Sequence, residues 1–193
     1  SYADQLFERG HDVKVFVPKT KKDQSGDKRY SVEELIPWIS SGNAALLPQL
    51  IWKLWNFDVL HLHYPFFGAA MFVTLVRILK GKKISLVTTY HMDVELAGLK
   101  GIYSKIGKKF LLPIILNYSD KILVSSIDYI ENSDIQNYYF SHKNKFEELP
   151  FGVPRKYSPN PKDEELLKRY NFSVEDKIVM LAGSLDSAHY FKG

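Results

Sequence analysis

The chain has 193 residues, of which 45% are hydrophobic and 25% charged, and its formal net charge is +4. This length allows one large domain, or one domain and part of another, with a packed core. The absence of cysteine excludes disulfides and cysteine-ligated metals. No apolar run approaches the roughly 20 residues that span a bilayer. Lysine dominates the basic residues, which fits an anionic small molecule or an anionic lipid surface as well as nucleic acid. The basic residues are scattered, however, and no recognition helix or aromatic platform appears, so we expect no nucleic-acid role.

Both ends of the chain fall inside predicted elements. Residues 1–9 have the apolar spacing of the last turns of a helix, which Gly10 stops, and a strand is predicted at 13–17. At the other end, residues 177–182 predict a buried strand. A buried parallel strand needs neighbouring strands. We therefore expect a chain truncated at both ends, and the alternative is a short edge strand with a frayed tail.

Apolar runs alternate with helical stretches in the middle of the chain. Strands are predicted at 57–61, 84–89, 121–124 and 146–149, and helices at 43–55, 66–79, 102–117 (bent at Pro113) and 163–170. Residues 19–29 predict a mobile loop, and Ser125 and Ser126 predict a helix N-cap. This βα order predicts an α/β fold with a Rossmann-like parallel sheet and right-handed crossovers.

Ligands of such sheets bind beyond the carboxyl ends of the strands, so the loops after strands are the candidate sites. His61 and His63 end one predicted strand, and His91 and Asp93 follow the next. Histidine there can donate hydrogen bonds to anionic or hydroxyl groups. Asp93 can accept from sugar hydroxyls or hold His91 in one tautomer. Backbone carbonyls satisfying His61 and His63 are the alternative, and two neighbouring histidines plus a distant one are a weak indication of zinc.

The last loop runs from Gly183 to Gly193 and includes Ser184 and Lys192. Gly183 allows a sharp turn after the predicted strand. Lys192, near the start of the next helix, suits a diphosphate together with free helix N–H groups. The P-loop pattern is absent.

Six segments in this order and spacing resemble the family 4 glycosyltransferases, retaining enzymes with the two-domain GT-B fold. The segments are ERGHDVKVF, FDVLHLHYPFFG, TTYHMD, SDKILVSS, LPFGVP and AGSLDSAHYFKG. The resemblance implies that residues 1–155 are most of the acceptor-side domain, without its first strand and glycine-rich loop. It implies a linker at 156–176, and the first strand and diphosphate loop of the nucleotide-sugar domain at 177–193.

The same resemblance implies roles for single residues. His91 matches the histidine near the donor sugar, and Lys192 matches the lysine that binds the donor diphosphate, beside Gly183 and Ser184. Ser184 replaces the family's usual arginine, and this loop is longer than is usual. We expect His63, Asp93 and Gly152 to face the acceptor or the cleft. The family's pair of glutamates for the donor is absent from the 193 residues.

The predicted function is transfer of a sugar, with retention, from a nucleotide sugar to a glycan, lipid or small-molecule acceptor, without metal or cofactor. We expect the fragment alone to be inactive. Another GT-B enzyme, such as a nucleotide-sugar epimerase, and a non-catalytic sugar or nucleotide-binding module are the alternatives. We expect a cytoplasmic protein. The lysine-rich, apolar stretch 100–112 fits a peripheral membrane contact, or a helix that packs on the sheet with a solvated lysine face.

Overall fold

The computed structural model describes residues 2–19, 29–41, 44–94, 101, 105–150, 152 and 161–180. It divides the chain into two compact units, Ser1–Phe151 and Gly152–Gly193. Most of the predicted loop at 19–29 and the first residues of the predicted linker lie outside the described residues.

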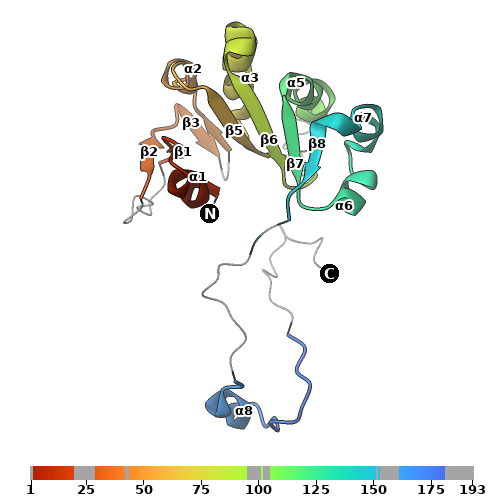
Figure 1. Cartoon of the computed structure of the whole chain (residues 1–193). Helices are drawn as coiled ribbons and strands as arrows, with labels where there is room; N and C mark the ends of the chain where they lie inside the picture. Colours follow the sequence, from red (N-terminus) through yellow and green to blue (C-terminus); the bar gives the residue numbers. More distant parts are fainter. Residues whose placement is uncertain are drawn as a thin grey trace. The chain divides into compact units, whose positions relative to one another are not determined.

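The strands in the described part of the chain belong to three separate sheets (Figure 1). They are β1 (Lys14–Pro18), β2 (Ser31–Leu35), β3 (Ile39–Ser41), β4 (Ala44–Leu46), β5 (Val59–Tyr64), β6 (Ser85–Tyr90), β7 (Lys121–Val124) and β8 (Phe146–Glu148). Strands β5-β6-β7-β8 form a parallel sheet in that order, β1 and β2 pair in parallel, and β3 and β4 form an antiparallel pair. The predicted α/β class and parallel sheet are confirmed.

Helices occupy the connections between the strands of the main sheet, as parallel pairing requires. The α-helices are α1 (Tyr2–Glu8), α2 (Leu50–Lys53), α3 (Ala70–Lys80), α5 (Leu112–Tyr118), α6 (Ile127–Glu131), α7 (Gln136–Ser141) and α8 (Glu164–Arg169). Shorter turns are the 3₁₀ segments η1 (Gly81–Lys83) and η3 (Lys143–Lys145) and the π-helical turn η2 (Gly107–Leu111). The Ser126 side chain accepts a hydrogen bond from the Tyr129 N–H at the start of α6, which confirms the predicted cap.

Alternation along β5 explains how this strand serves both the core and the site. Leu60 and Leu62 are buried in the cluster that packs against α3, whereas His61 and His63 lie on the other side of the strand. The neighbouring strand β6 contributes Leu86 to the same cluster. A second cluster around Ile122 fills the space near β7. The core therefore holds rigidly the strand that carries two of the histidines.

The predicted helix at 43–55 is wrong in its first half. Residues Ala44–Leu46 form β4, and only Leu50–Lys53 are helical. Alanine and leucine favour a helix, but here Ala45 and Leu47 are buried and the Ala45 N–H donates to the Phe67 carbonyl. Tertiary burial and pairing with β3 override the local preference.

The predicted buried strand at 177–182 is also wrong over its described part. Residues 177–180 are in no strand, and Val179 and Met180 are 96% and 83% exposed. None of the described strands pairs with this segment. An apolar run without neighbouring strands has no partners for its backbone groups, so it does not form a parallel strand.

Pro113 changes the predicted helix at 102–117 in a specific way. The chain makes a π-helical turn at Gly107–Leu111, where the Leu112 N–H donates to the Gly107 carbonyl, and α5 then begins with Pro113 in its first turn. Proline lacks an N–H and is tolerated at such a start. Residues 102–104 lie outside the described residues.

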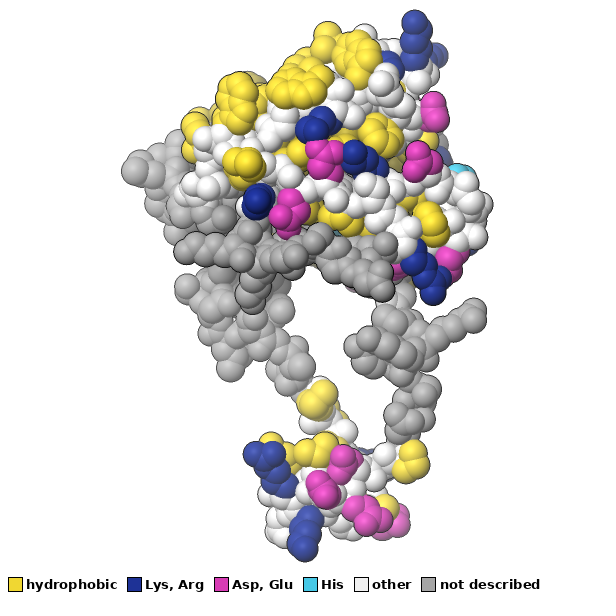
Figure 2. All heavy atoms as spheres, turned by 90° about the vertical axis from the view of Figure 1, so that its left-hand side faces the viewer, with side chains coloured by type: hydrophobic (Ala, Val, Ile, Leu, Met, Phe, Trp, Pro, Cys, Tyr) yellow, Lys and Arg dark blue, Asp and Glu magenta, His cyan; other side chains and the backbone are white. Residues whose placement is uncertain are grey.

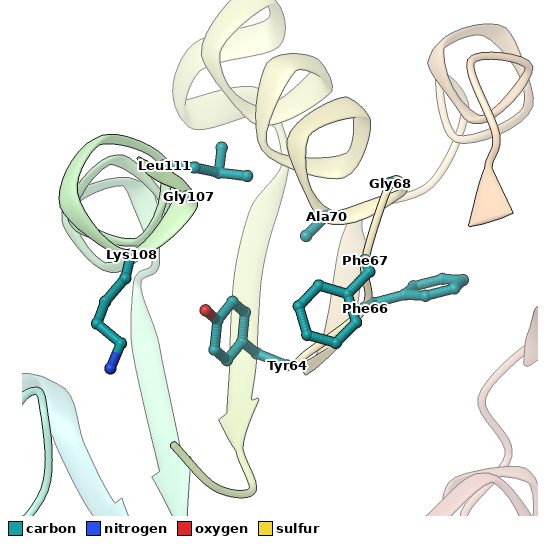
Figure 3. Close-up of a pocket in the computed structure, with 8 residues that line it drawn as sticks. All are labelled: Tyr64, Phe66, Phe67, Gly68, Ala70, Gly107, Lys108 and Leu111. Atoms are coloured by element: carbon teal, nitrogen blue, oxygen red, sulfur yellow. The ribbon is translucent and has the colours of Figure 1, made fainter. Parts of the chain in front are cut away.

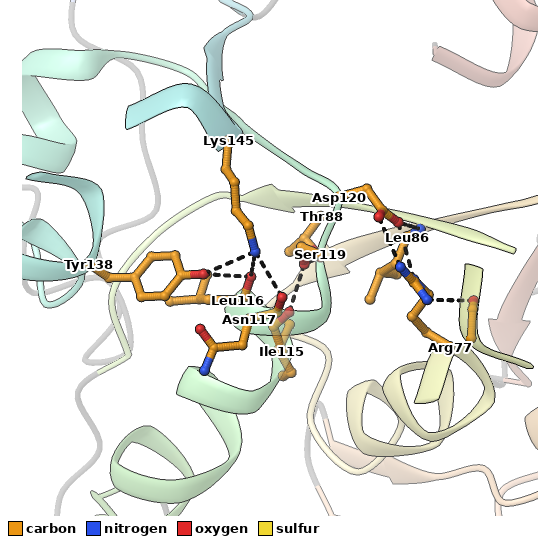
Figure 4. A network of polar contacts seen from close by, with 11 residues as sticks. Arg77, Leu86, Thr88, Ile115, Leu116, Asn117, Ser119, Asp120, Tyr138 and Lys145 are labelled. Atoms are coloured by element: carbon orange, nitrogen blue, oxygen red, sulfur yellow. Dashed lines mark hydrogen bonds and ion pairs between the residues drawn. The ribbon is translucent and has the colours of Figure 1, made fainter. Parts of the chain in front are cut away.

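Polar side chains fasten the amino ends of β6 and β7 to the helices (Figure 4). The Asp120 carboxylate accepts from Arg77 Nη2 at 2.9 Å and from the Leu86 N–H at 2.8 Å. Lys145 Nζ donates to the carbonyls of Leu116 and Asn117, at 3.2 and 2.8 Å, and so caps the end of α5. Burial lowers the pKa of Lys145.

Replacing Lys145 with methionine should lower the free energy of unfolding by about 2 kcal/mol, because the last carbonyls of α5 lose a charged donor. Urea titration followed by far-UV circular dichroism measures the change. Lys83→Met, at an exposed lysine, is the control and should stay within about 0.5 kcal/mol of the parent. Equal effects in both variants would contradict the capping role.

Gly68 lets the loop after β5 approach the β3–β4 pair. Its φ is +80°, and a Cβ added there would lie 2.7 Å from the Ala45 carbonyl oxygen. A side chain at this position therefore meets both backbone strain and a clash with another backbone.

Gly68→Ala should destabilise the protein by about 3 kcal/mol, from strain and displacement of the β3–β4 pair. Gly10→Ala is the matched control, because Gly10 also has a positive φ (+87°) but open space around it. That variant should lose only about 1 kcal/mol. Denaturant midpoints compare the two, and similar losses would show that the close approach contributes nothing.

Candidate active site

The three predicted histidines come together at the carboxyl ends of β5 and β6. His63 is the register partner of Thr89, two residues before His91. The His91 N–H donates to the Tyr64 carbonyl at 3.0 Å and so continues the strand pairing past the end of β6. This backbone bond fixes where the His91 side chain leaves the sheet.

The imidazole rings form a stacked column. The ring centroids of His61 and His63 are 4.5 Å apart, and those of His63 and His91 are 5.1 Å apart with the planes only 14° from parallel. The Tyr2 ring of α1 lies 5.9 Å from that of His61. The period of two along β5 places both of its histidines on one side, so the His-Leu-His spacing was the signal for this column.

Side chains, not backbone carbonyls, are the partners of these rings. Nε2 of His61 lies 2.7 Å from Thr89 Oγ1, and Nδ1 of His63 lies 2.8 Å from His91 Nε2. The alternative in which carbonyls satisfy His61 and His63 is therefore wrong. The bond between His63 and His91 could not be predicted from the sequence, because it joins a residue of β5 to one that follows β6, 28 positions further along the chain.

A bond between two imidazole nitrogens requires one N–H and one lone pair. Protonation of both rings would turn two donors toward each other, so the His63–His91 pair favours a state with at most one shared charge. Burial, followed by the charges of neighbouring histidines, lowers the pKa of His61 to about 4 and lowers that of His63. Burial also lowers the pKa of His91. The column is thus neutral near pH 7.

Asp93 ties the loop after β6 to the region between α6 and α7. Its Oδ1 accepts from the Tyr90 hydroxyl at 2.6 Å, and both of its carboxylate oxygens lie 3.2 Å from the Asp134 N–H. Burial and the Asp93 carboxylate raise the pKa of Tyr90, so the phenol stays a donor. These bonds hold the loop that follows His91. The predicted contact of Asp93 with an acceptor stays a prediction.

The other predicted site residues are not placed relative to the histidine column, and their roles stay predictions. Gly183, Ser184 and Lys192 lie outside the described residues. Gly152 is exposed and begins the second unit. Among the residues that the structure describes, no group of histidine, aspartate and glutamate side chains has the arrangement of a metal site.

A small pocket opens beside the carboxyl end of β5 (Figure 3). Its lining residues are Tyr64, Phe66, Phe67, Gly68, Ala70, Gly107, Lys108 and Leu111. The volume is about 50 Å³, far below the roughly 300 Å³ of an ordinary ligand pocket. The Lys108 ammonium forms an ion pair with Asp134. The pocket therefore suits one small group, such as a methyl or a few water molecules, rather than a sugar ring.

The sequence matches the profile of Glycosyltransferase Family 4 over residues 1–154. The match covers most of the chain and the whole of the parallel sheet that carries the histidines. The chain therefore belongs to glycosyltransferase family 4, and glycosyl transfer is the general activity of that family. A comparison with curated proteins gave no match.

The histidine column makes stability depend on pH. The unfolded chain takes up protons near pH 6.5, whereas folded His61 does so only near pH 4, so folding weakens as the pH falls between these values. We expect His61 to contribute a fall of about 2 kcal/mol in the free energy of unfolding from pH 7 to pH 5, because the unfolded imidazole is protonated over this range and the folded one is not. His61→Asn should flatten this dependence in urea titrations. An unchanged slope would show that His61 does not titrate as its surroundings imply.

Proposed function

We propose that this protein transfers a sugar, with retention of configuration, from a nucleotide sugar to a glycan, a lipid or a small-molecule acceptor. One observation carries the proposal: His91 is fixed at the carboxyl edge of the parallel sheet by a backbone bond to Tyr64 and a ring bond to His63. Membership of the family supports the class of reaction. The donor serves as substrate, and the proposal requires no resident cofactor.

Glycosyl transfer from such a donor develops positive charge on the sugar and negative charge on the departing diphosphate. Fixed dipoles and donors that face these charges lower the barrier. A neutral His91 with a defined ring orientation can donate to, or accept from, the sugar without the cost of reorganisation. In the proposal, Lys192 and nearby N–H groups at Gly183 and Ser184 meet the diphosphate, and His63, Asp93 and Gly152 face the acceptor side.

The remaining features of the proposal concern partners and location. We propose a cytoplasmic enzyme whose lysine-rich segment 100–112 contacts the membrane face. In support, Ile106 and Phe110 are 54% and 60% exposed, and Lys105 and Lys109 are exposed beside them. The 193 residues lack the glutamate pair that the resemblance implies for donor binding, so we propose that they do not catalyse alone.

His91→Ala should lower the rate of sugar transfer by about 100-fold or more, because the transition state loses a positioned hydrogen-bonding partner. The substitution is made in a longer form of the enzyme that also contains the donor-binding residues. Product formation with a radiolabelled nucleotide sugar measures the rate, and nuclear magnetic resonance of the product gives its anomeric configuration. The 193-residue chain alone should show no transfer.

His11→Ala is the matched control, because His11 is exposed and lies before β1, and it should leave the rate unchanged. Near-normal turnover by a folded His91→Ala protein would remove His91 from the mechanism. Two outcomes favour the alternatives. Interconversion of nucleotide sugars without an acceptor favours an epimerase, and binding of the nucleotide sugar without turnover favours a binding module.

A further inference from the structure

Helix α3 has two apolar faces, and only one of them is buried. Its inner face contributes Ala70, Val73 and Val76 to the core. Its outer face consists of Met71, Leu75, Ile78 and Leu79, which are 36% to 59% exposed and recur at helical spacing. A helix that is apolar on all sides is ordinarily buried on all sides. The outer face of α3 therefore indicates a second contact.

The short helix α2 and the turn after it extend this surface with two tryptophans. Trp52 and Trp55 are 60% and 42% exposed, and α2 packs beside α3. Lys80 at the end of α3 lies with its Nζ 5.4 Å from the centre of the Trp55 ring and donates to the Trp55 carbonyl. We call the surface made by Trp52, Trp55, Leu75, Ile78 and Leu79 the tryptophan face.

Hydrophobic side chains gather over the end of the first unit where α2 and α3 lie (Figure 2). Lys53 of α2 forms an ion pair with Glu33, which also pairs with Lys14, so this acidic group is already neutralised. Phe110 and Ile114 are also exposed, on η2 and on α5, the helix that packs beside α3. Exposed apolar patches of this kind mark protein or membrane contacts.

The charges at the edge of the face distinguish these two kinds of partner. Lys82 and Lys83 are exposed directly after α3, close to Lys80. Asp58 is an exposed acidic group at this edge, where its carbonyl accepts from the Ser85 N–H. Interface cores between proteins are depleted in lysine and enriched in arginine. Arg77, the arginine of α3, is bound to Asp120 instead of facing outward.

Lysine beside exposed tryptophan is typical of surfaces that lie on an anionic bilayer. Tryptophan rings settle at the level of the lipid headgroups, and lysines nearby are attracted to anionic lipids. Among the described residues, no helix is long and apolar enough to pass through a membrane, so a contact of this kind lies on the surface. We propose that the tryptophan face docks the protein on an anionic lipid bilayer. The proposal does not depend on the reaction at His91.

Intrinsic fluorescence reports this contact directly, because the chain has three tryptophans. Trp38→Phe leaves Trp52 and Trp55 as the emitters. With the full 193-residue chain in low salt, phosphatidylcholine vesicles that contain about one third phosphatidylglycerol should shift this emission to the blue and bind the protein in co-sedimentation. Pure phosphatidylcholine vesicles should bind it far more weakly, and added salt should release it.

Variants separate the tryptophan face from other exposed groups. Trp52→Ser with Trp55→Ser should lower partitioning at least tenfold, and Lys82→Gln with Lys83→Gln about 25-fold, from roughly fivefold per lysine. Phe140→Ser is the matched control, because Phe140 is 51% exposed on α7, away from α2 and α3 in Figure 1, and it should partition like the parent. Circular dichroism confirms that each variant is folded.

Three results would overturn the proposal. The first is absence of binding to the anionic vesicles, and the second is binding that the double tryptophan variant leaves unchanged. The third is a parent protein that does not bind vesicles but self-associates in light scattering, with the double tryptophan variant remaining monomeric. In that case a second copy of the chain, and not a bilayer, would occupy the tryptophan face. Loss of partitioning in the two double variants, with Phe140→Ser unaffected, is the result that the proposal requires.

Discussion

Parallel pairing of β5 with β6 is the constraint on which the candidate site depends. The register sets His63 beside Thr89, and one further backbone bond carries His91 to the Tyr64 carbonyl. Burial of Leu60, Leu62 and Leu86 against α3 locks this register, because a slip by one residue would turn the leucines outward and the histidines inward. The chemistry at the sheet edge is thus positioned by the aliphatic core beneath it.

Local pattern was enough to predict much of this arrangement. The run Lys121–Val124 forms the predicted strand, and Asp163 caps the charged helix α8 through the N–H groups of Glu165 and Leu166. His61 and His63 lie near the end of one strand and His91 follows the next, so the rule for parallel sheets predicts that they share one edge. That step needed only the order of strands and helices.

Other features depend on contacts that no local pattern contains. The β4 segment looks helical in composition, yet Ala45 is held by the Phe67 carbonyl and Leu47 is buried. The sequence predicts that Asp93 contacts a ligand, and the structure adds that its carboxylate accepts from the Tyr90 hydroxyl and the Asp134 N–H. Asp134 lies 41 residues further along the chain, so no local pattern predicts this contact. The tryptophan face was missed for a similar reason. Apolar residues on a helix predict burial, and only the packed fold shows which of them stay outside.

The direction of the strands in the main sheet has a geometric consequence for any lipid substrate. Trp55 and Lys80 precede β5 and β6, whereas His63 and His91 stand at the opposite ends of these strands. Six residues of extended chain span roughly 20 Å. The Trp55 and Lys80 end of the tryptophan face is therefore separated from the imidazoles by about the length of a strand. A lipid that enters beside the tryptophans would have to reach along that length to meet the imidazoles, whereas an acceptor at the carboxyl edge meets them directly.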